Sequence, residues 1–256
     1  MFIKKYEEST HIVYKIFGIK FKLKKELNNK ILLINSSQDI IEIKKIKGLD
    51  IKFKGANNRI IFNEQIPIFK NFKIYCQNDA TIIFNKNSSF NELIIDALGK
   101  NNKCYFGNNF TNTRYLLISF GREPNLSCNI GEDCMFATNI IFRLSDFHTI
   151  IDNTTNKITN YGKNIVVGNH VWLTQNVTIL KGVHIADNSI IGTGSVVTKD
   201  CTTINSMYAG LPAKIIKTNV SWTRECPNEH LSNPCRSRER VIPLIDFKFN
   251  KLEQVA

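Results

Sequence analysis

Residues 167–201 read VGNHVWLTQNVTILKGVHIADNSIIGTGSVVTKDC, and an aliphatic residue occupies every sixth position of this stretch. The aliphatic positions are Val167, Leu173, Ile179, Ile185, Ile191 and Val197. Four residues after each stands a small or β-branched residue: Val171, Val177, Val183, Ser189, Ser195 and Cys201. An ordinary sheet has a side-chain period of two, whereas a triangular β-solenoid, with one short strand per face and a tight turn at each corner, has a period of six. The stretch therefore predicts a β-solenoid with its aliphatic residues pointing inward. The turns have four glycines to help them: Gly168, Gly182, Gly192 and Gly194.

The six-residue spacing also occurs upstream. The inward positions there are Ile130, Phe136 and Phe142, with Cys134 and Ile140 as their partners. From Ile130 to Val167 is 37 residues, which fits two 18-residue coils plus one extra residue. We therefore expect a continuous solenoid, with the extra residue in the stretch that carries His148.

A looser repeat precedes the strict one. Short apolar runs followed by turn residues recur 22, 22 and 24 residues apart, at Phe62, Phe84, Phe106 and Ile130. A period of this length predicts stacked coils with small loop insertions. We expect a β-helix domain over residues 56–217, in which residues 165–202 carry the strict repeat.

The N-terminal part carries a different pattern. Between residues 17 and 23, apolar residues alternate with Gly18, Lys20 and Lys22, a period of two that predicts a strand. We interpret residues 1–55 as a β-rich capping segment with a solvated outer face. The alternative is that the basic face rests on an acidic membrane surface.

Composition and charge limit the function classes. The chain has 256 residues, 43% of them hydrophobic, and no apolar run approaches the ~18 residues that span a bilayer. The charged N-terminus lacks a signal-peptide pattern, so a cytoplasmic protein is expected. The formal charge is +12, but the lysines are dispersed, which argues against a nucleic-acid partner. Two explanations of the positive charge remain. One is an anionic substrate, cofactor or membrane surface, and the other is a coding bias toward Lys, Asn and Ile.

The seven cysteines are odd in number and contain no CxxC pair, so we expect reduced, structural thiols. Cys134 and Cys201 fall at inward small-residue positions, and Cys128 is expected in a turn. The chain offers no sensible set of metal ligands, so no metal is expected.

Residues 128–217 resemble the hexapeptide-repeat acyltransferases, in particular the branch that O-acetylates bacterial surface polysaccharides and sugars. The resemblance rests on Ser145-Asp146-Phe147-His148-Thr149-Ile150-Ile151-Asp152, on 167–172 (VGNHVW), 177–183 (VTILKGV) and 191–200 (IGTGSVVTKD), and on 209–214 (AGLPAK). It implies a left-handed parallel β-helix that assembles as a homotrimer, with active sites between neighbouring subunits. Ser221-Trp222-Thr223-Arg224 resembles the helix that follows the solenoid in this branch, so we expect a short C-terminal helix and tail over residues 218–256.

The resemblance also implies the catalytic residues. His148 would be the base that removes the proton from the sugar hydroxyl, because imidazole titrates near neutral pH. Asp146 or Asp152 would orient its ring. Trp172 would line the pocket for the acceptor and the thioester, although plain packing against the next coil is the alternative.

The same resemblance assigns acetyl-CoA as co-substrate. Its pantetheine arm would contact Gln175, Thr193, Thr198 and Lys199, and its nucleotide would lie near Lys214 and Lys217. Arg143 and Arg122 would suit an acidic sugar such as a sialic acid, through a bidentate contact with its carboxylate. Structural salt bridges are the other interpretation of these two arginines.

The most favoured function is therefore acetyl-CoA-dependent O-acetylation of a bacterial surface glycan, such as a capsule, lipooligosaccharide or sialic acid. Direct transfer is expected, because buried cysteines do not serve as nucleophiles. Two alternatives remain: N-acetylation of a nucleotide-linked amino sugar, and a non-catalytic solenoid that serves as a binding scaffold. Contact with the inner membrane surface is a further candidate interaction.

Overall fold

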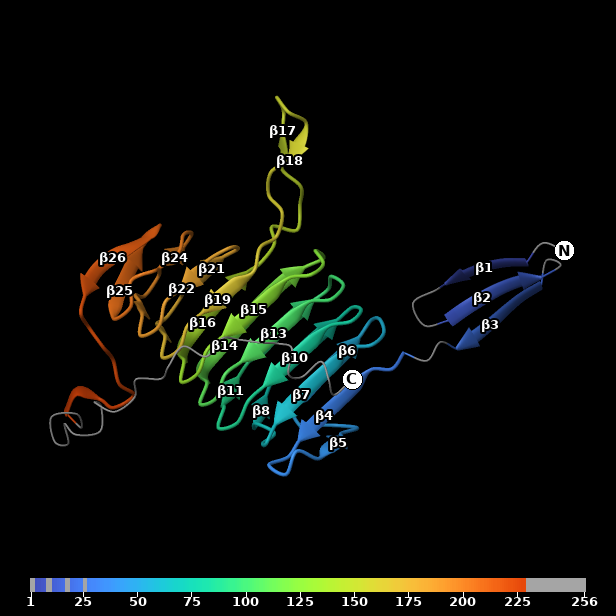
Figure 1. Ribbon diagram of the computed structural model, residues 1–256, viewed down its shortest axis with the longest axis horizontal. Helices are drawn as coiled ribbons and strands as arrows, with labels where there is room; N and C mark the ends of the chain where they lie inside the picture. Colours follow the sequence, from blue (N-terminus) through green and yellow to red (C-terminus); the bar gives the residue numbers. More distant parts are fainter. Residues whose placement is uncertain (1–2, 8–10, 17–18, 25–26, 229–256) are drawn as a thin grey trace. The chain divides into compact units, whose positions relative to one another are not determined.

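The computed structural model of the chain describes residues 3–7, 11–16, 19–24 and 27–228, with side chains from residue 27 onward. Short parallel strands stack coil upon coil (Figure 1), and their pairing divides them among the three faces of a β-helix. The predicted all-β solenoid is thereby confirmed.

The first face is one parallel ladder, in which each strand pairs with the strand of the next coil. Its strands are β4 (Lys30–Ile34), β7 (Arg59–Asn63), β10 (Thr81–Phe84), β13 (Lys103–Phe106), β15 (Ser127–Ile130), β19 (Ile165–Val167) and β22 (His184–Ile185).

The second and third faces share two long strands that bend around the corner between them, β14 (Thr111–Gly121) and β16 (Met135–Arg143). The second face also contains β8 (Phe69–Lys70), β11 (Phe90–Asn91), β20 (Trp172–Leu173), β23 (Ile190–Ile191) and β25 (Ser206–Gly210). The third also contains β6 (Leu49–Phe53), β9 (Phe72–Cys76), β12 (Leu93–Ala97), β21 (Thr178–Leu180) and β24 (Val196–Val197).

Antiparallel strands close two of the ladders. β5 (Ile40–Glu42) pairs with β4 at the start of the first face, and β26 (Ala213–Thr218) pairs with β25 at the end of the second. Both strands occupy backbone groups that an open parallel ladder leaves unpaired.

A column of inward side chains runs through the first face and joins the loose repeat to the strict one. Its members, all buried and each paired in register with the next, are Phe62, Phe84, Phe106, Ile130, Val167 and Ile185. The rings of Phe62 and Phe84 stack at 5.3 Å, and those of Phe84 and Phe106 stack at 5.1 Å. In the strict repeat, all six aliphatic residues are fully buried and their small or β-branched partners are at most 2% exposed, as predicted.

The corners turn mostly at residues with positive φ, and many of these are asparagines, such as Asn176 (φ 59°) and Asn188 (φ 58°). Gly182 and Gly194 also have positive φ, at 83° and 72°. Gly168 serves another purpose, because a Cβ there would lie 2.2 Å from Asp187 Oδ1 in the next coil. Asparagine tolerates the left-handed region better than other residues with a Cβ, so it takes the place of glycine at these corners.

The expected division of residues 130–167 into two coils is wrong. Ile130 pairs directly with Val167, so these residues form one coil and one excursion, residues 145–163, that leaves the solenoid. The excursion ends in a two-stranded hairpin, β17 (Ile151–Asp152) and β18 (Lys157–Ile158) (Figure 1). A spacing near a multiple of 18 is compatible with either arrangement.

The N-terminal strands β1 (Ile3–Glu7), β2 (His11–Ile16) and β3 (Ile19–Lys24) form an antiparallel sheet of their own. The strand expected at residues 17–23 corresponds to β3, whereas the capping role of residues 1–55 stays a prediction. The helix expected from residues 221–224 is wrong, because these residues belong to no helix or strand, and most of the remaining tail lies outside the described residues. Among the described residues, no helix is long and apolar enough to cross a membrane.

We predict that Phe84→Ala lowers the free energy of unfolding by about 3–5 kcal/mol, because it removes a buried ring between two stacked neighbours and leaves a cavity. Urea unfolding followed by circular dichroism measures this loss. Lys86→Ala is the control, because the ion pair of Lys86 with Glu64 (3.0 Å) lies on the surface and contributes at most about 1 kcal/mol. Equal losses of unfolding free energy in both variants would contradict the proposed importance of the column of inward side chains.

Candidate active site

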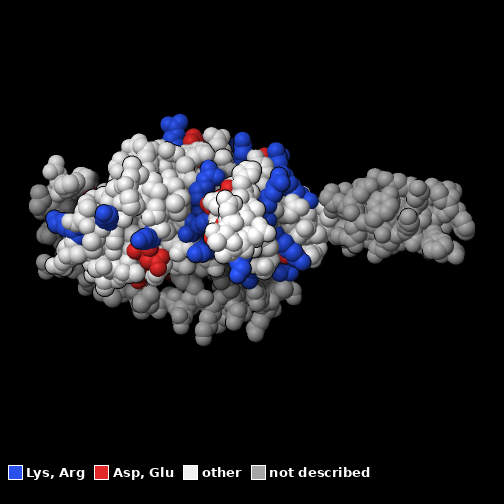
Figure 2. All heavy atoms as spheres, turned by 90° about the horizontal axis from the view of Figure 1, so that it is seen from above, with Lys and Arg blue, Asp and Glu red and all other residues white. Residues whose placement is uncertain are grey.

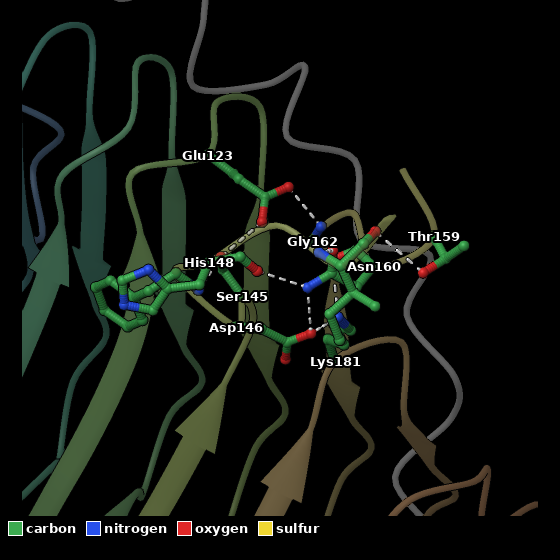
Figure 3. A network of polar contacts seen from close by, with 10 residues as sticks. Glu123, Ser145, Asp146, His148, Thr159, Asn160, Gly162 and Lys181 are labelled. Carbon is green, nitrogen blue, oxygen red and sulfur yellow. Dashed lines mark hydrogen bonds and ion pairs between the residues drawn. The ribbon is translucent and has the colours of Figure 1, made fainter. Parts of the chain in front are cut away.

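The excursion at residues 145–163 leaves the corner between the third and first faces, and its two ends are tied together there. Lys163 donates its backbone N–H to the Leu144 carbonyl at 3.1 Å, which closes the corner beneath the excursion. The Glu123 carboxylate, from the same corner one coil earlier, accepts hydrogen bonds from Ser145 Oγ at 2.6 Å and from the Gly162 N–H (Figure 3). One carboxylate therefore fixes both the start and the end of the excursion.

A second contact holds the excursion to the following coil. The Asp146 carboxylate forms an ion pair with Lys181, at the next corner along the solenoid, and accepts a hydrogen bond from Asn160 Nδ2 at 2.9 Å. The hydrogen bond from Lys181, supported by that from Asn160, holds the pKa of Asp146 below its usual value. A lowered pKa means that the contact contributes at neutral pH and is lost only as the pH falls through that pKa.

His148 lies in a tight turn next to this ion pair. Its N–H donates to the Asp146 carbonyl at 2.8 Å, and its own carbonyl accepts from Asn160 Nδ2 at 2.8 Å. Phe147, between them, has a φ of 65°, which is rare for a bulky residue and costs about 1–3 kcal/mol. A hydrogen bond from the N–H of the third residue to the carbonyl of the first, with a positive φ at the middle residue, is the pattern of a strained γ-turn.

The imidazole of His148 is exposed and points to the opposite side from the Asp146 carboxylate (Figure 3). Within the described part of the chain, no hydrogen bond joins the ring to another residue. Asp152 lies in the hairpin, where the backbone N–H groups of Thr155 and Thr154 lower its pKa. Neither predicted carboxylate therefore orients the ring within one chain, and the ring is open to an incoming hydroxyl.

Trp172, the predicted pocket residue, lies elsewhere. It begins β20 on the second face, half-buried, and pairs with Met135 and Ile190 of the adjacent coils. The excursion that carries His148 leaves the solenoid at the corner between the third and first faces. The two side chains thus belong to different sides of one solenoid.

The residues predicted to bind the cofactor occupy two corners and the last strand. Gln175 and Thr193 lie at the corner between the second and third faces, where Gly194 N–H donates to the Gln175 carbonyl at 2.9 Å. Thr198 and Lys199 follow β24, at the same corner as Lys181. Lys214 and Lys217 lie on β26, and all six side chains are exposed.

Of the two predicted acceptor arginines, Arg122 is exposed and Arg143 is half-buried at the end of β16. Arg143 is in register with Ser119, whose hydroxyl donates to Asp96 at 2.8 Å. Burial raises the pKa of Asp96, while hydrogen bonds and the charge of Arg143 act in the opposite direction. Arg143 therefore has a carboxylate close by, and Arg122 is the freer of the two cations.

Lys and Arg side chains are conspicuous on the side toward which the excursion projects, and few acidic groups are visible there (Figure 2). An anionic ligand that approached His148 from this side would meet a basic surface. In the part of the chain from residue 27 to 228, no three His, Cys, Asp or Glu side chains are arranged as metal ligands.

Three residues that hold the site were not predicted from the sequence: Glu123, Asn160 and Lys181. Lys181 stands within the segment 177–183 that carries the resemblance, and the register between Arg143 and Leu180 brings it beside the excursion. The position of Lys181, directly after strand β21 of the third face, could therefore have indicated from the sequence that it lies beside the excursion. Asn160 carries no such signal, because it belongs to the excursion rather than to the repeat.

The described cysteines are buried, with the exception of Cys226. Cys134 and Cys201 point inward as predicted, whereas Cys128 lies on β15 instead of in a turn. Burial raises the pKa of Cys76 to about 12 and that of Cys201 to about 12. These thiols are unsuited to act as nucleophiles.

Comparisons with known proteins agree with the β-helix architecture. Residues 164–199 match the family model described as bacterial transferase hexapeptide (six repeats). A polysialic acid O-acetyltransferase of Escherichia coli O1:K1 / APEC is 40% identical over 111 residues, which are 43% of this chain and 36% of that protein, so the match spans little more than a third of its length. WbbJ of Escherichia coli K12, a candidate lipopolysaccharide biosynthesis O-acetyl transferase, is 32% identical over 57% of this chain and 76% of its own. The crystal structure of the polysialic acid O-acetyltransferase OatWY superposes with a TM-score of 0.56 at 26% identity and covers 70% of this chain and 84% of that one. With the three-faced parallel architecture, these similarities identify the fold as a left-handed parallel β-helix.

We predict that a thiol reagent at pH 8 labels Cys226 in the native protein and leaves Cys76, Cys104, Cys128, Cys134 and Cys201 unmodified until denaturant is added. The reason is that burial blocks access to all five thiols, and at Cys76, Cys104 and Cys201 it also raises the thiol pKa. Peptide mapping by mass spectrometry identifies the labelled positions, and denatured protein is the control. Rapid native labelling of Cys128 or Cys201 would show that the solenoid opens in solution.

Proposed function

The chain belongs to the hexapeptide-repeat acyltransferase family, and on that premise we propose that it transfers the acetyl group of acetyl-CoA to a hydroxyl of a bacterial surface glycan. The observation that carries this proposal is the position of His148. Its imidazole is exposed, and no hydrogen bond joins it to the rest of the described chain, in the excursion just before the strict hexapeptide repeat. A base for an external hydroxyl needs such access.

The mechanism follows from the chemistry of a thioester. His148 takes the proton of the sugar hydroxyl as its oxygen attacks the thioester carbonyl carbon. The C–S bond then breaks, coenzyme A leaves as the thiolate, and the protonated imidazole returns the proton to it. The burial of the described repeat-region cysteines supports this direct route over an acetyl-cysteine intermediate.

For the acceptor we propose an acidic polymer, with sialic acid as the leading candidate. Two similar proteins are polysialic acid O-acetyltransferases, although the sequence match to the first covers only part of each chain. The exposed guanidinium of Arg122 and the basic surface around the excursion support an anionic sugar. Arg143 would bind the acceptor as a second cation if the carboxylate of the acceptor competed with Asp96 for its guanidinium.

For the cofactor we propose that acetyl-CoA lies along Gln175, Thr193, Thr198 and Lys199, with its nucleotide phosphates near Lys214 and Lys217. The exposed position of all six side chains supports this track. We also propose a cytoplasmic protein that touches the inner membrane surface, because a formal charge of +12 favours contact with anionic head groups.

We propose a homotrimer with the active site between neighbours. In one chain His148 and Trp172 lie on different sides of the solenoid, so a pocket that contains both needs two copies. The excursion also exposes Ile150, Ile151 and Tyr161, and such an apolar projection favours contact with another subunit.

We predict that the wild-type protein acetylates polysialic acid and that His148→Ala lowers kcat by about 10²–10⁴-fold, because the hydroxyl loses its base. Coenzyme A release and NMR of the acetylated sugar measure the reaction, and calorimetry tests that coenzyme A still binds. His184→Ala is the matched control, since His184 is an exposed histidine on β22, in the ladder of the first face. Neutral galactosides and nucleotide-linked amino sugars complete the acceptor panel. Transfer to an amine alone, or no transfer to any acceptor, would contradict the proposal.

We predict a mass in light scattering of about three times the 29.3 kDa of one chain. Trimers mixed from equal amounts of His148→Ala and Trp172→Ala chains should recover about a quarter of the wild-type sites, because a head-to-tail ring then contains interfaces with both native residues. The two variants measured separately are the controls. An active monomer, or mixed trimers as inactive as the parents, would rule out a shared site.

A further inference from the structure

We propose that Asn160 is the residue that positions His148, by holding the backbone around it in its strained turn. The inference rests on the proposed function, in which His148 is the base. Asn160 lies on the returning limb of the excursion, 12 residues after His148, and its side chain faces the turn (Figure 3).

One amide group contacts three points of this turn. Asn160 Nδ2 donates to the His148 carbonyl at 2.8 Å and to Asp146 Oδ2 at 2.9 Å. Asn160 Oδ1 accepts from the Ile150 N–H at 2.7 Å. Asp146, His148 and Ile150 are thus all hydrogen-bonded to the planar side-chain amide of Asn160.

The turn needs such a restraint. Phe147 has a φ of 65°, and a bulky residue persists in this region only where its surroundings hold it. Within the turn, the local bonds are the His148 N–H to the Asp146 carbonyl at 2.8 Å and the Phe147 N–H to Ser145 Oγ at 3.2 Å. Both can break as the chain relaxes to negative φ, whereas Asn160 fixes the turn from outside it.

Asn160 is itself tied to the solenoid. Lys181 Nζ donates to the Asn160 carbonyl at 2.9 Å and also pairs with Asp146. Two residues further, the Gly162 N–H donates to Glu123. The rigid coils on both sides of the excursion therefore determine where Asn160 lies, and Asn160 in turn determines where the imidazole lies.

Asn160 makes these contacts with the backbone of His148 and not with its ring. Its loss should therefore move the base relative to the hydroxyl without removing a group that binds substrate. A displacement of about 1 Å is enough to slow an aligned reaction by about 10- to 100-fold.

The first experiment compares Asn160→Ala with Thr159→Val. Thr159 donates from its hydroxyl to the Ile150 carbonyl at 3.2 Å, so this control loses a neighbouring bond of the excursion that does not touch residues 146–148. We expect Asn160→Ala to lower kcat by about 10- to 100-fold with KM for acetyl-CoA within about twofold, and Thr159→Val to match the wild type. Equal melting temperatures would show that the solenoid is intact, since the excursion lies outside its core.

The second experiment is a double-mutant cycle with His148→Ala. If Asn160 acts through His148, Asn160→Ala causes no further loss of turnover once the imidazole is absent. A general structural role would lower the residual rate again. Additive losses, or normal turnover in Asn160→Ala, would overturn the inference while the proposed function stood.

The third experiment does not depend on activity. In protein labelled with ¹³C-histidine, the His148 signal, assigned by its disappearance in His148→Ala, should shift or broaden in Asn160→Ala and stay unchanged in Thr159→Val. An unchanged signal in Asn160→Ala would overturn the inference. A changed signal in a protein that acetylates no acceptor would refute the proposed function and leave the positioning of His148 by Asn160 intact.

Discussion

The structure depends on the in-register stacking of inward side chains from each coil to the next. The aromatic column that begins at Phe62 continues as the aliphatic column through Val167, without a slip in register. Because side chains alternate across a strand, a slip of one residue would turn the buried set outward, so the register is strongly specified. Aligned strands also align the corners. Residues 22 and 35 positions apart, such as Ser145 with Glu123 and Asp146 with Lys181, therefore meet at one place.

The parts of the fold that repeat could be predicted, and the parts that interrupt the repeat could not. A six-residue period requires one inward residue per face, so the sequence alone identified both inward sets of the strict repeat. The interval from Ile130 to Val167 was misread because its length fits two coils as well as one coil with an excursion. Only the pairing of these two residues distinguishes the arrangements, and pairing is a property of the folded chain.

The candidate site divides in the same way. The local sequence of His148 resembles a known motif, but the turn that carries it is bonded to Asn160, and the excursion around it is bonded to Lys181 and Glu123. None of these three is adjacent to it in sequence. Asp146 illustrates the limit: its proximity suggested an orienting carboxylate, whereas the folded corner supplies a lysine that takes that carboxylate instead.

The two antiparallel strands at the ends of the ladders have a consequence for how copies of the chain can meet. A parallel ladder with bare ends is a template on which an identical ladder can add, and repeated addition produces fibrils. Here β5 runs against β4, and β26 runs against β25, so these ladders reverse direction before they end. Addition of another copy along the solenoid axis is thereby disfavoured at the start of the first face and at the end of the second. A second copy that met the described coils at either of these places would face an antiparallel strand and not the open end of a parallel ladder.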